Sequence, residues 1–392
     1  MVQCGPAGWP GEAIPEMLDQ ATKGHRMFIT RMAVSFLSVV LAGTGTTLAA
    51  EATNPAEGRP PVAAKPGVRQ ASLRTAGKAA GLLVGAATFP AALQEERYAK
   101  ALAREFNFIT PENEMKWEAI HPEPDKWNFG PADTLVKFAQ KHGMKVKGHC
   151  LVWHAALPKW VNAQMTPEEL RGAVRKHILG EVGHYKGKVY AWDVVNEAVD
   201  DKEGLRKSLF LDKLGEGYIA EVFRLAHEAD PKALLIYNEY GAEGLGGKSD
   251  RVYELVKKLK ADGVPIGGVG LQMHISAKGY PKPADIAANV QRLAELGLKV
   301  NISEMDVRIR EVKGELSERL ELQRKVYNDV IAACIQEKGF IGVTFWGFTD
   351  KYSWVDHYFG ADDPLLFDEN YKLKPAYEGV MDALSSKSLP LR

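Results

Sequence analysis

The sequence predicts an α/β fold of the (β/α)8 TIM barrel class, organised as a single catalytic domain. Two observations carry this prediction. Between residues 73 and 384, short apolar segments alternate with longer amphipathic segments, which is the pattern of repeated βα units around a parallel sheet. Eight apolar segments occur, and no phosphate-binding glycine motif opens the helices after them, so a closed barrel is favoured over an open nucleotide-binding sheet.

Each expected strand is a short run of apolar residues bounded by turn-forming residues. The eight strands are expected at residues 82–89, 106–110, 145–150, 189–195, 233–238, 267–274, 298–305 and 342–348. Amphipathic spacing predicts helices between them, among others at 131–143, 248–263, 283–297 and 317–339. These four segments close on Gly, which is typical of a helix C-terminus.

A segment near the N-terminus has the composition of a secretory signal peptide. At residues 27–50, Arg31 precedes a mostly apolar run at 33–42, and small residues follow it. This run of about ten residues is well short of the roughly 20 that a membrane-spanning helix needs. We therefore expect a signal peptide and a secreted protein, extracellular or periplasmic; the alternative is a buried helix.

The remaining boundaries follow from these two assignments. If translation starts at Met27 or Met32, the residues before that methionine form an N-terminal extension that is not translated. The expected parts are an N-terminal extension at 1–26, the signal peptide at 27–50, a Pro/Ala-rich disordered linker at 51–72, the barrel at 73–384 and a short tail at 385–392.

Composition limits the classes of partner. Lys plus Arg number 50 and Asp plus Glu number 50, so no net charge favours nucleic acid or an acidic membrane surface. The three cysteines lie far apart without C-x-x-C spacing, which predicts neither a zinc site nor a disulfide framework. We expect no cofactor and a neutral small-molecule or polymer substrate.

Two acids end otherwise apolar strands, Glu197 on the fourth and Glu304 on the seventh. In this fold the chemistry lies at the C-terminal ends of the strands, so both should face one mouth. A pair of carboxyl groups across a cleft is what cleavage of a glycosidic bond requires. Either acid alone would be read as a solvated loop acid or a member of a structural ion pair.

Histidines also lie at strand ends, namely His149, His154 and His274. Each could simply make a satisfied hydrogen bond, and imidazoles with carboxylates could instead hold zinc. Because the chain lacks His-x-His and His-Glu-x-x-His spacing, we predict no metal site.

Tryptophans add a further signal. Five of them lie at or just after strand ends, where flat rings suit the C–H faces of sugars: Trp117, Trp153, Trp160, Trp346 and Trp354. Trp192, inside the fourth strand, is expected to pack in the core.

Six ordered motifs carry a family resemblance. "TPENEMKW", "GHCLVWH", "WDVVNEA", "GLQMH", "ISEMD" and "DKYSWV" resemble glycoside hydrolase family 10, the retaining endo-β-1,4-xylanases, over the whole of residues 73–384. The resemblance implies hydrolysis of internal β-1,4-xylosidic bonds by a two-carboxylate double displacement. It implies xylan or xylo-oligosaccharide as the partner, no nucleic acid, no membrane in the mature form, and a monomer.

The resemblance also implies residue roles. Glu197 would be the general acid/base and Glu304 the nucleophile, supported by Asn196, His274 and Asp306. The residues that match the family's substrate-binding positions are Glu112, Asn113, Lys116, His149, Trp153, Gln272, Trp346 and Trp354.

Strand geometry makes two of these roles testable. Alternation puts Glu304 and Asp306 on one face, where His274 could bridge them. Strict alternation would put Asn196 and Glu197 on opposite faces, so the strand should end or bulge there.

Three departures from the family pattern occur: Cys150 for Thr, Ala155 and Ala156 for Ser-Gln, and Glu239 in place of Asp in N-D-Y. Because Ala156 lacks a long polar side chain at the cleft edge, a β-glucanase or mannanase on the same barrel stays an alternative. A catalytically inactive glycan-binding barrel would be expected to lack Glu197 or Glu304.

Overall fold

The computed structural model describes residues 71–387. The predicted extension at 1–26, the signal peptide at 27–50 and all but the last two residues of the linker at 51–72 lie outside these described residues. The first described helix, α2 (Leu73–Ala79), begins where the barrel was expected to begin. The last, α13 (Pro375–Lys387), continues past residue 384, so 385–387 are helical and not tail.

Within the described residues, eight parallel strands close into a barrel, as predicted. They are β1 (Leu83–Thr88), β2 (Phe108–Pro111), β3 (Lys145–Trp153), β4 (Ala191–Asn196), β5 (Leu234–Glu239), β6 (Gly268–Leu271), β8 (Lys299–Arg308) and β9 (Phe340–Phe345). Each pairs with the next, β6 pairs with β8, and β9 pairs with β1 to complete the ring.

The strand expected at 267–274 is interrupted. It forms β6 and then, after a break at Gln272 and Met273, the short β7 (His274–Ser276), which pairs with the extended tip of β8. Met273 has a left-handed backbone, with φ 68°, which a continuous strand does not allow. The break re-aims His274 toward β8, where His274 pairs in register with Asp306.

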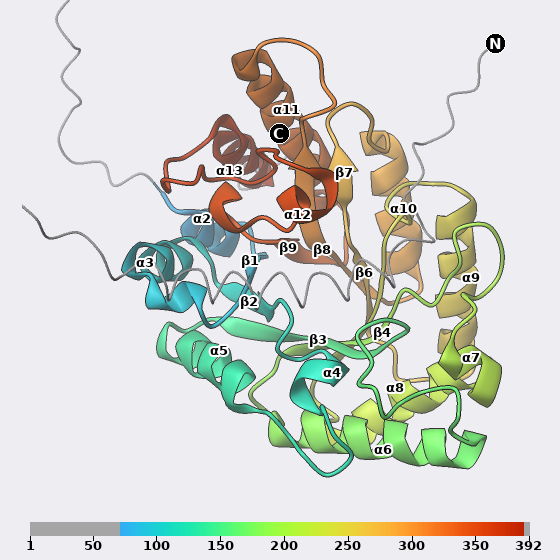
Figure 1. Cartoon of the computed structure of the whole chain (residues 1–392). Coiled ribbons are helices and arrows are strands. Elements are labelled where there is room, and N and C mark those ends of the chain that lie inside the picture. The colour runs from blue at the N-terminus through green and yellow to red at the C-terminus, as the bar shows by residue number, and fades with distance from the viewer. Residues whose placement is uncertain (1–70, 388–392) are drawn as a thin grey trace, which may run out of the picture. The chain divides into compact units, whose positions relative to one another are not determined.

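Helices surround the strands (Figure 1). The four predicted helices are α5 (Gly130–Lys141), α9 (Gly247–Ala261), α10 (Pro283–Glu295) and α11 (Leu316–Ile335). The other helices of the described chain are α3 (Glu96–Glu105), α4 (Trp117–Ile120), α6 (Pro167–His184), α7 (Leu209–Leu214), α8 (Tyr218–Ala229) and α12 (Val355–Phe359), with 3-10 turns η1 (Ala92–Gln94) and η2 (Asp350–Tyr352). Of the helices at 71–387, none combines the length and apolar character needed to cross a membrane.

The helix α6 illustrates how local sequence builds this outer layer. Thr166 and Glu169 form a reciprocal capping box, and Pro167 occupies the first helical position, where its missing N–H costs nothing. Leu170, Val174 and Ile178 recur every four residues and are buried against the barrel.

The fourth strand packs as expected around Trp192, which is fully buried. Gly148 on the neighbouring β3 makes room for it, because a Cβ atom there would lie 2.1 Å from the Trp192 ring. Close packing between β3 and β4 thus fixes the position of Trp192 in the core.

Candidate active site

The fourth strand ends at the point where the sequence required it to end. The pairing of β4 with β5 shifts register between Asp193 and Val195, β4 stops at Asn196, and Glu197 adopts a left-handed backbone with φ 57°. Left-handed backbone is uncommon for any residue other than Gly, Asn or Asp. The break in alternation lets Asn196 and Glu197 serve the same side of the barrel.

Three donors from different strand ends hold the Glu197 carboxyl group. Trp153 Nε1 donates to Oε2 at 2.9 Å, while Gln272 Nε2 and Asn196 Nδ2 donate to Oε1 at 2.9 and 3.1 Å. Glu197 is only 7% exposed. Its carboxyl group therefore has a defined direction before any substrate binds.

The Glu304 carboxyl group lies at the end of a short polar chain that starts at Glu197. Asn238 Nδ2 donates to Glu304 Oε1 at 2.7 Å and also to Asn196 Oδ1 at 2.8 Å. Ser303 Oγ donates to Asn238 Oδ1 at 2.6 Å, which fixes the orientation of that amide. Two side-chain amides thus connect the two acids.

His274 bridges Glu304 and Asp306, as strand alternation predicted. Its Nε2 lies 3.2 Å from Glu304 Oε2, and its Nδ1 lies 2.7 Å from Asp306 Oδ2. Trp354 Nε1 also donates to Asp306 Oδ2, at 2.7 Å. All three side chains of this bridge are buried.

The bridge determines the charge on both partners. Burial by itself lowers the pKa of His274, but the charges and hydrogen bonds of Asp306 and Glu304 outweigh it and raise that pKa to about 10. Burial would raise the pKa of Glu304, but electrostatic interactions with His149, His274 and Lys147 and the His274 hydrogen bond lower it to about 2. Glu304 is therefore a carboxylate at neutral pH, beside an imidazolium.

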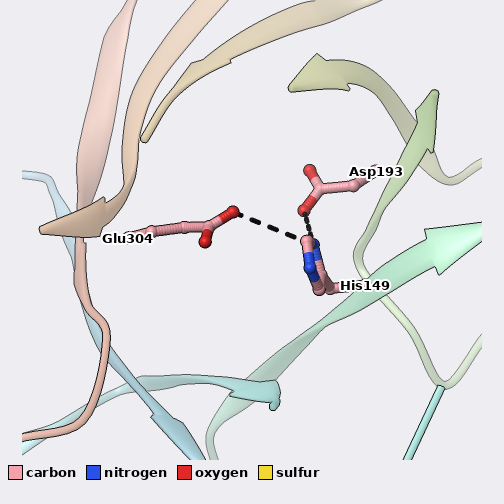
Figure 2. A group of neighbouring side chains, drawn as sticks. All are labelled: His149, Asp193 and Glu304. Atoms are coloured by element: carbon pink, nitrogen blue, oxygen red, sulfur yellow. Dashed lines mark hydrogen bonds and ion pairs between the residues drawn. The ribbon is translucent and has the colours of Figure 1, made fainter. Parts of the chain in front are cut away.

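A second histidine approaches Glu304 from β3. Figure 2 shows His149 between Asp193 and Glu304, with Nδ1 2.9 Å from Asp193 Oδ2 and 4.0 Å from Glu304 Oε1. These three side chains are close enough together to hold a cation. However, the Lys147 ammonium already forms an ion pair with the same Asp193 oxygen, at 2.8 Å, so the protein itself supplies the positive charge.

Of the remaining predicted binding residues, Lys116 and Trp346 contact side chains that lie against these acids. Lys116 Nζ donates to Asn113 Oδ1 at 2.8 Å and lies 5.3 Å from the centroid of the Trp153 ring. Trp346 places its ring 5.1 Å from that of His149, at a steep angle. Glu112 precedes Asn113 on the same loop, anchored by its N–H to the carbonyl of Thr88.

Two tryptophans do not belong to this group, contrary to the sequence prediction. Trp117 is 2% exposed and stacks on His177 of α6, with ring centroids 4.1 Å apart. Trp160 packs edge-on against Trp117 and His121 and donates Nε1 to the His121 carbonyl at 3.3 Å. Both rings fill the space between loop and helix. A position near a strand end does not determine whether a ring turns toward the mouth.

Three residues of the site were not predicted. Asp193 and Lys147 lie inside strands, and Asn238 is the last residue but one of a strand that reads as apolar. The available signal was a charged or amide side chain in an otherwise buried strand, since such a group must find a polar partner there. In each case the partner is another residue of the site.

Comparisons with known proteins agree with this geometry. Residues 72–383 match the family model "Glycosyl hydrolase family 10". The chain is 44% identical over 294 residues to endo-1,4-beta-xylanase B of Thermotoga neapolitana, covering 74% of this chain and 84% of the relative. It is 46% identical over 295 residues to a beta-1,4-xylanase of Dictyoglomus thermophilum, covering 71% and 82%.

A solved structure is similar over the same region. The crystal structure of xylanase 10B from Thermotoga petrophila RKU-1 in complex with xylobiose has a TM-score of 0.80 and 42% sequence identity, covering 82% of this chain and 100% of that one.

Proposed function

The chain belongs to glycosyl hydrolase family 10, and we propose that it is an endo-1,4-β-xylanase in which Glu197 is the general acid/base and Glu304 the nucleophile. The two roles are supported by the different partners of the two carboxyl groups. Glu304 is held as a carboxylate by the imidazolium of His274. Glu197 is surrounded by the neutral donors Trp153, Gln272 and Asn196.

The first half of the reaction follows from these positions. The Glu197 carboxyl group gives its proton to the glycosidic oxygen as the bond from that oxygen to the anomeric carbon breaks. A carboxylate oxygen of Glu304 forms a new bond to the anomeric carbon from the opposite face, and the leaving sugar departs as an alcohol. The product is a covalent xylosyl ester of Glu304.

In the second half the roles reverse. The Glu197 carboxylate takes a proton from a water molecule, whose oxygen attacks the anomeric carbon while the ester bond to Glu304 breaks. Each half inverts the configuration of the anomeric carbon, so the complete reaction leaves it unchanged. Retention requires the two carboxyl groups to be about 5–5.5 Å apart, and a separation of roughly 6.5–9.5 Å would indicate inversion instead.

Substrate binding is proposed for the residues that line these acids. Asn196 is suited to hydrogen-bond the sugar 2-hydroxyl. Lys116, Asn113 and Glu112 would bind the sugar one step further from the cleaved bond, and the rings of Trp346 and Trp354 would contact sugar faces. The xylobiose complex of the similar Thermotoga petrophila enzyme supports a site for short xylo-oligosaccharides.

Secretion as a monomer is a further proposal. Secretion is supported by the charged, apolar and small-residue order of residues 27–50. N-terminal sequencing of protein recovered from the culture medium should find a start close to residue 51. A start before residue 27 would contradict the signal-peptide assignment.

The product profile tests the proposed activity. The protein should release reducing sugar from xylan, with xylo-oligosaccharides as early products, and release much less from carboxymethylcellulose. Proton NMR should show the β-anomer of the new reducing end first. Faster release from carboxymethylcellulose would favour the β-glucanase alternative, and no release from either polymer would contradict an endo-acting hydrolase.

A further inference from the structure

A buried polar network contacts the backbone that follows Glu197. We define this backing network as Arg206, Tyr237, Glu239 and Lys248, which contact the backbone just after Glu197 or one another. Glu239 is fully buried, and the Arg206 and Lys248 side chains are 11% and 8% exposed. None of the steps derived above uses these four residues.

The network contacts the segment 197–199 at every peptide group. Arg206 Nε donates to the Glu197 carbonyl at 2.9 Å. Tyr237 Oη accepts from the N–H groups of Ala198 and Val199, each at 3.1 Å, and Glu239 Oε2 accepts from Val199 N–H at 3.1 Å. A left-handed backbone at a glutamate persists only where surrounding contacts determine it, and these contacts do so.

Strand β5 divides its side chains between the two acids. Asn238 points to the barrel interior and donates to Glu304, whereas Tyr237 and Glu239, one position to either side, point to the loop after β4. Tyr237 Oη donates to Glu239 Oε2 at 2.6 Å. As an acceptor from both Tyr237 and Val199, this carboxyl group works best in its ionised form.

Lys248 supplies a positive charge that favours the ionised form of Glu239. Its ammonium, at the start of α9, lies 3.1 Å from Glu239 Oε1 and 2.7 Å from Asp201 Oδ1, and 3.3 Å from the centroid of the Tyr240 ring. Burial raises the pKa of Glu239 to about 7 even with Lys248 lowering it. Without Lys248, Glu239 would hold a proton at neutral pH.

We propose that Lys248 and Glu239 are positioning residues for the acid/base: together they fix the left-handed backbone at Glu197 and so aim its carboxyl group at the glycosidic oxygen. This inference rests on the proposed role of Glu197. It adds two residues that do not touch substrate, and it gives the Glu239 departure from N-D-Y a function, since this carboxylate accepts from the Val199 N–H.

The test compares two substrates that differ in their need for a proton. Dinitrophenyl xylobioside has a leaving group acidic enough to depart unassisted, whereas phenyl xylobioside requires protonation by Glu197. In Lys248→Met, kcat/KM for phenyl xylobioside should fall about 10- to 100-fold, a part of the 10²–10⁴-fold that acid/base catalysis contributes. For dinitrophenyl xylobioside it should fall less than about threefold.

Two further variants and one control complete the design. Glu239→Gln should show the same selective loss, because its amide puts a donor where an acceptor is needed. Lys248→Arg keeps the charge and should restore most of the phenyl xylobioside rate. Lys258→Met removes a lysine of the same helix that is 71% exposed and pairs with Asp262, and it should change neither rate.

The outcomes separate this inference from the proposed function. Equal losses on both substrates, or no loss, in both Lys248→Met and Glu239→Gln would overturn the positioning role. If Lys248→Met does not fold, Glu239→Gln and Lys248→Arg decide the question. Glu197→Ala, measured beside them, must show strong leaving-group selectivity and rescue by azide; if it does not, the acid/base assignment itself is wrong.

Discussion

A buried carboxylate such as Glu304 normally binds a proton, because burial disfavours the charged form. Here two imidazoles and Lys147 reverse that tendency, and the contact from His274 is the most direct, at 3.2 Å. The pKa of His274 is raised to about 10, so it stays cationic through neutral pH and does not serve as a base there. The sequence motif "SEMD" thus carries an ion-pair chain as well as a nucleophile.

The substitution His274→Gln should move the acidic limb of the pH profile. With His274 present, Glu304 remains ionised down to about pH 2. When the positive charge is removed, burial is less well opposed, the pKa of Glu304 rises, and activity should be lost at higher pH than in the parent protein. The measurement is kcat/KM against pH with dinitrophenyl xylobioside, for which protonation of the leaving group is not needed.

His227→Gln is the matched control, because His227 is exposed on α8, outside the strands. Its acidic limb should coincide with that of the parent protein. An unchanged acidic limb in His274→Gln would mean that His274 does not set the charge of Glu304.

At the scale of elements, the ends of the strands direct neighbouring side chains to different acids. The end of β5 sends Asn238 to one acid and Glu239 to the backbone of the other, and the break between β6 and β7 turns Gln272 and His274 toward different acids. These pairs are only one or two residues apart. A shift of one residue in β5 would therefore take Asn238 away from Glu304 and Glu239 away from the backbone that follows Glu197.

The packing of α4 on α6 is expected to be separable from the site. Trp117→Ala would remove a buried ring that stacks on His177, and should cost about 3–5 kcal/mol of stability. Trp153→Ala, in contrast, removes a half-buried ring whose Nε1 bonds to Glu197, and should lower kcat/KM far more than it lowers Tm. Thermal melts and xylan hydrolysis well below Tm would show the contrast. An unchanged Tm in Trp117→Ala would contradict the packing role and support the original prediction that Trp117 lines the cleft.

The strands and the two acids could be predicted from the sequence, while several partners could not. The expectation that Glu304 ends its strand is wrong, because β8 continues to Arg308 and pairs there with β7. Glu197 and Glu304 follow apolar runs, so their positions are readable from periodicity alone. The left-handed Met273 carries no glycine or turn signal, and it divides a strand that reads as continuous. Trp153 is the last residue of β3, whereas Trp117 begins α4 and stacks on His177, and the sequence does not show this difference.

At the scale of the whole molecule, buried ionisable groups predict how stability depends on pH. His274 has a folded pKa of about 10, above its ordinary 6.5, so its contribution is complete below pH 6.5 and is lost as pH rises through about 10. Burial raises the pKa of Asp350 from 3.8 to about 7 despite the charge of Lys374. The contribution of Asp350 to stability is therefore lost as pH rises from 3.8 through about 7. Glu304 has the opposite sign, and its contribution is lost as pH falls from 4.5 through about 2.

We therefore expect the highest Tm in weakly acidic solution and a decline between pH 6.5 and 10. Calorimetry across this range should show the decline, and His274→Gln should reduce its slope because the proton-binding group is absent. A Tm that rises over pH 6.5–10 in the parent protein would contradict the raised pKa of His274.

Trapping the covalent intermediate tests the two-carboxylate mechanism most directly. Fluorine at C2 of the sugar destabilises the oxocarbenium-like transition states of both steps, while a dinitrophenyl leaving group lets the first step proceed, so the glycosyl-enzyme accumulates. Mass spectrometry after reaction with dinitrophenyl 2-deoxy-2-fluoroxylobioside should find one label per chain, on the peptide that contains Glu304, and none in Glu304→Gln. A label on another residue, or no label on protein that cleaves xylan, would contradict Glu304 as the nucleophile.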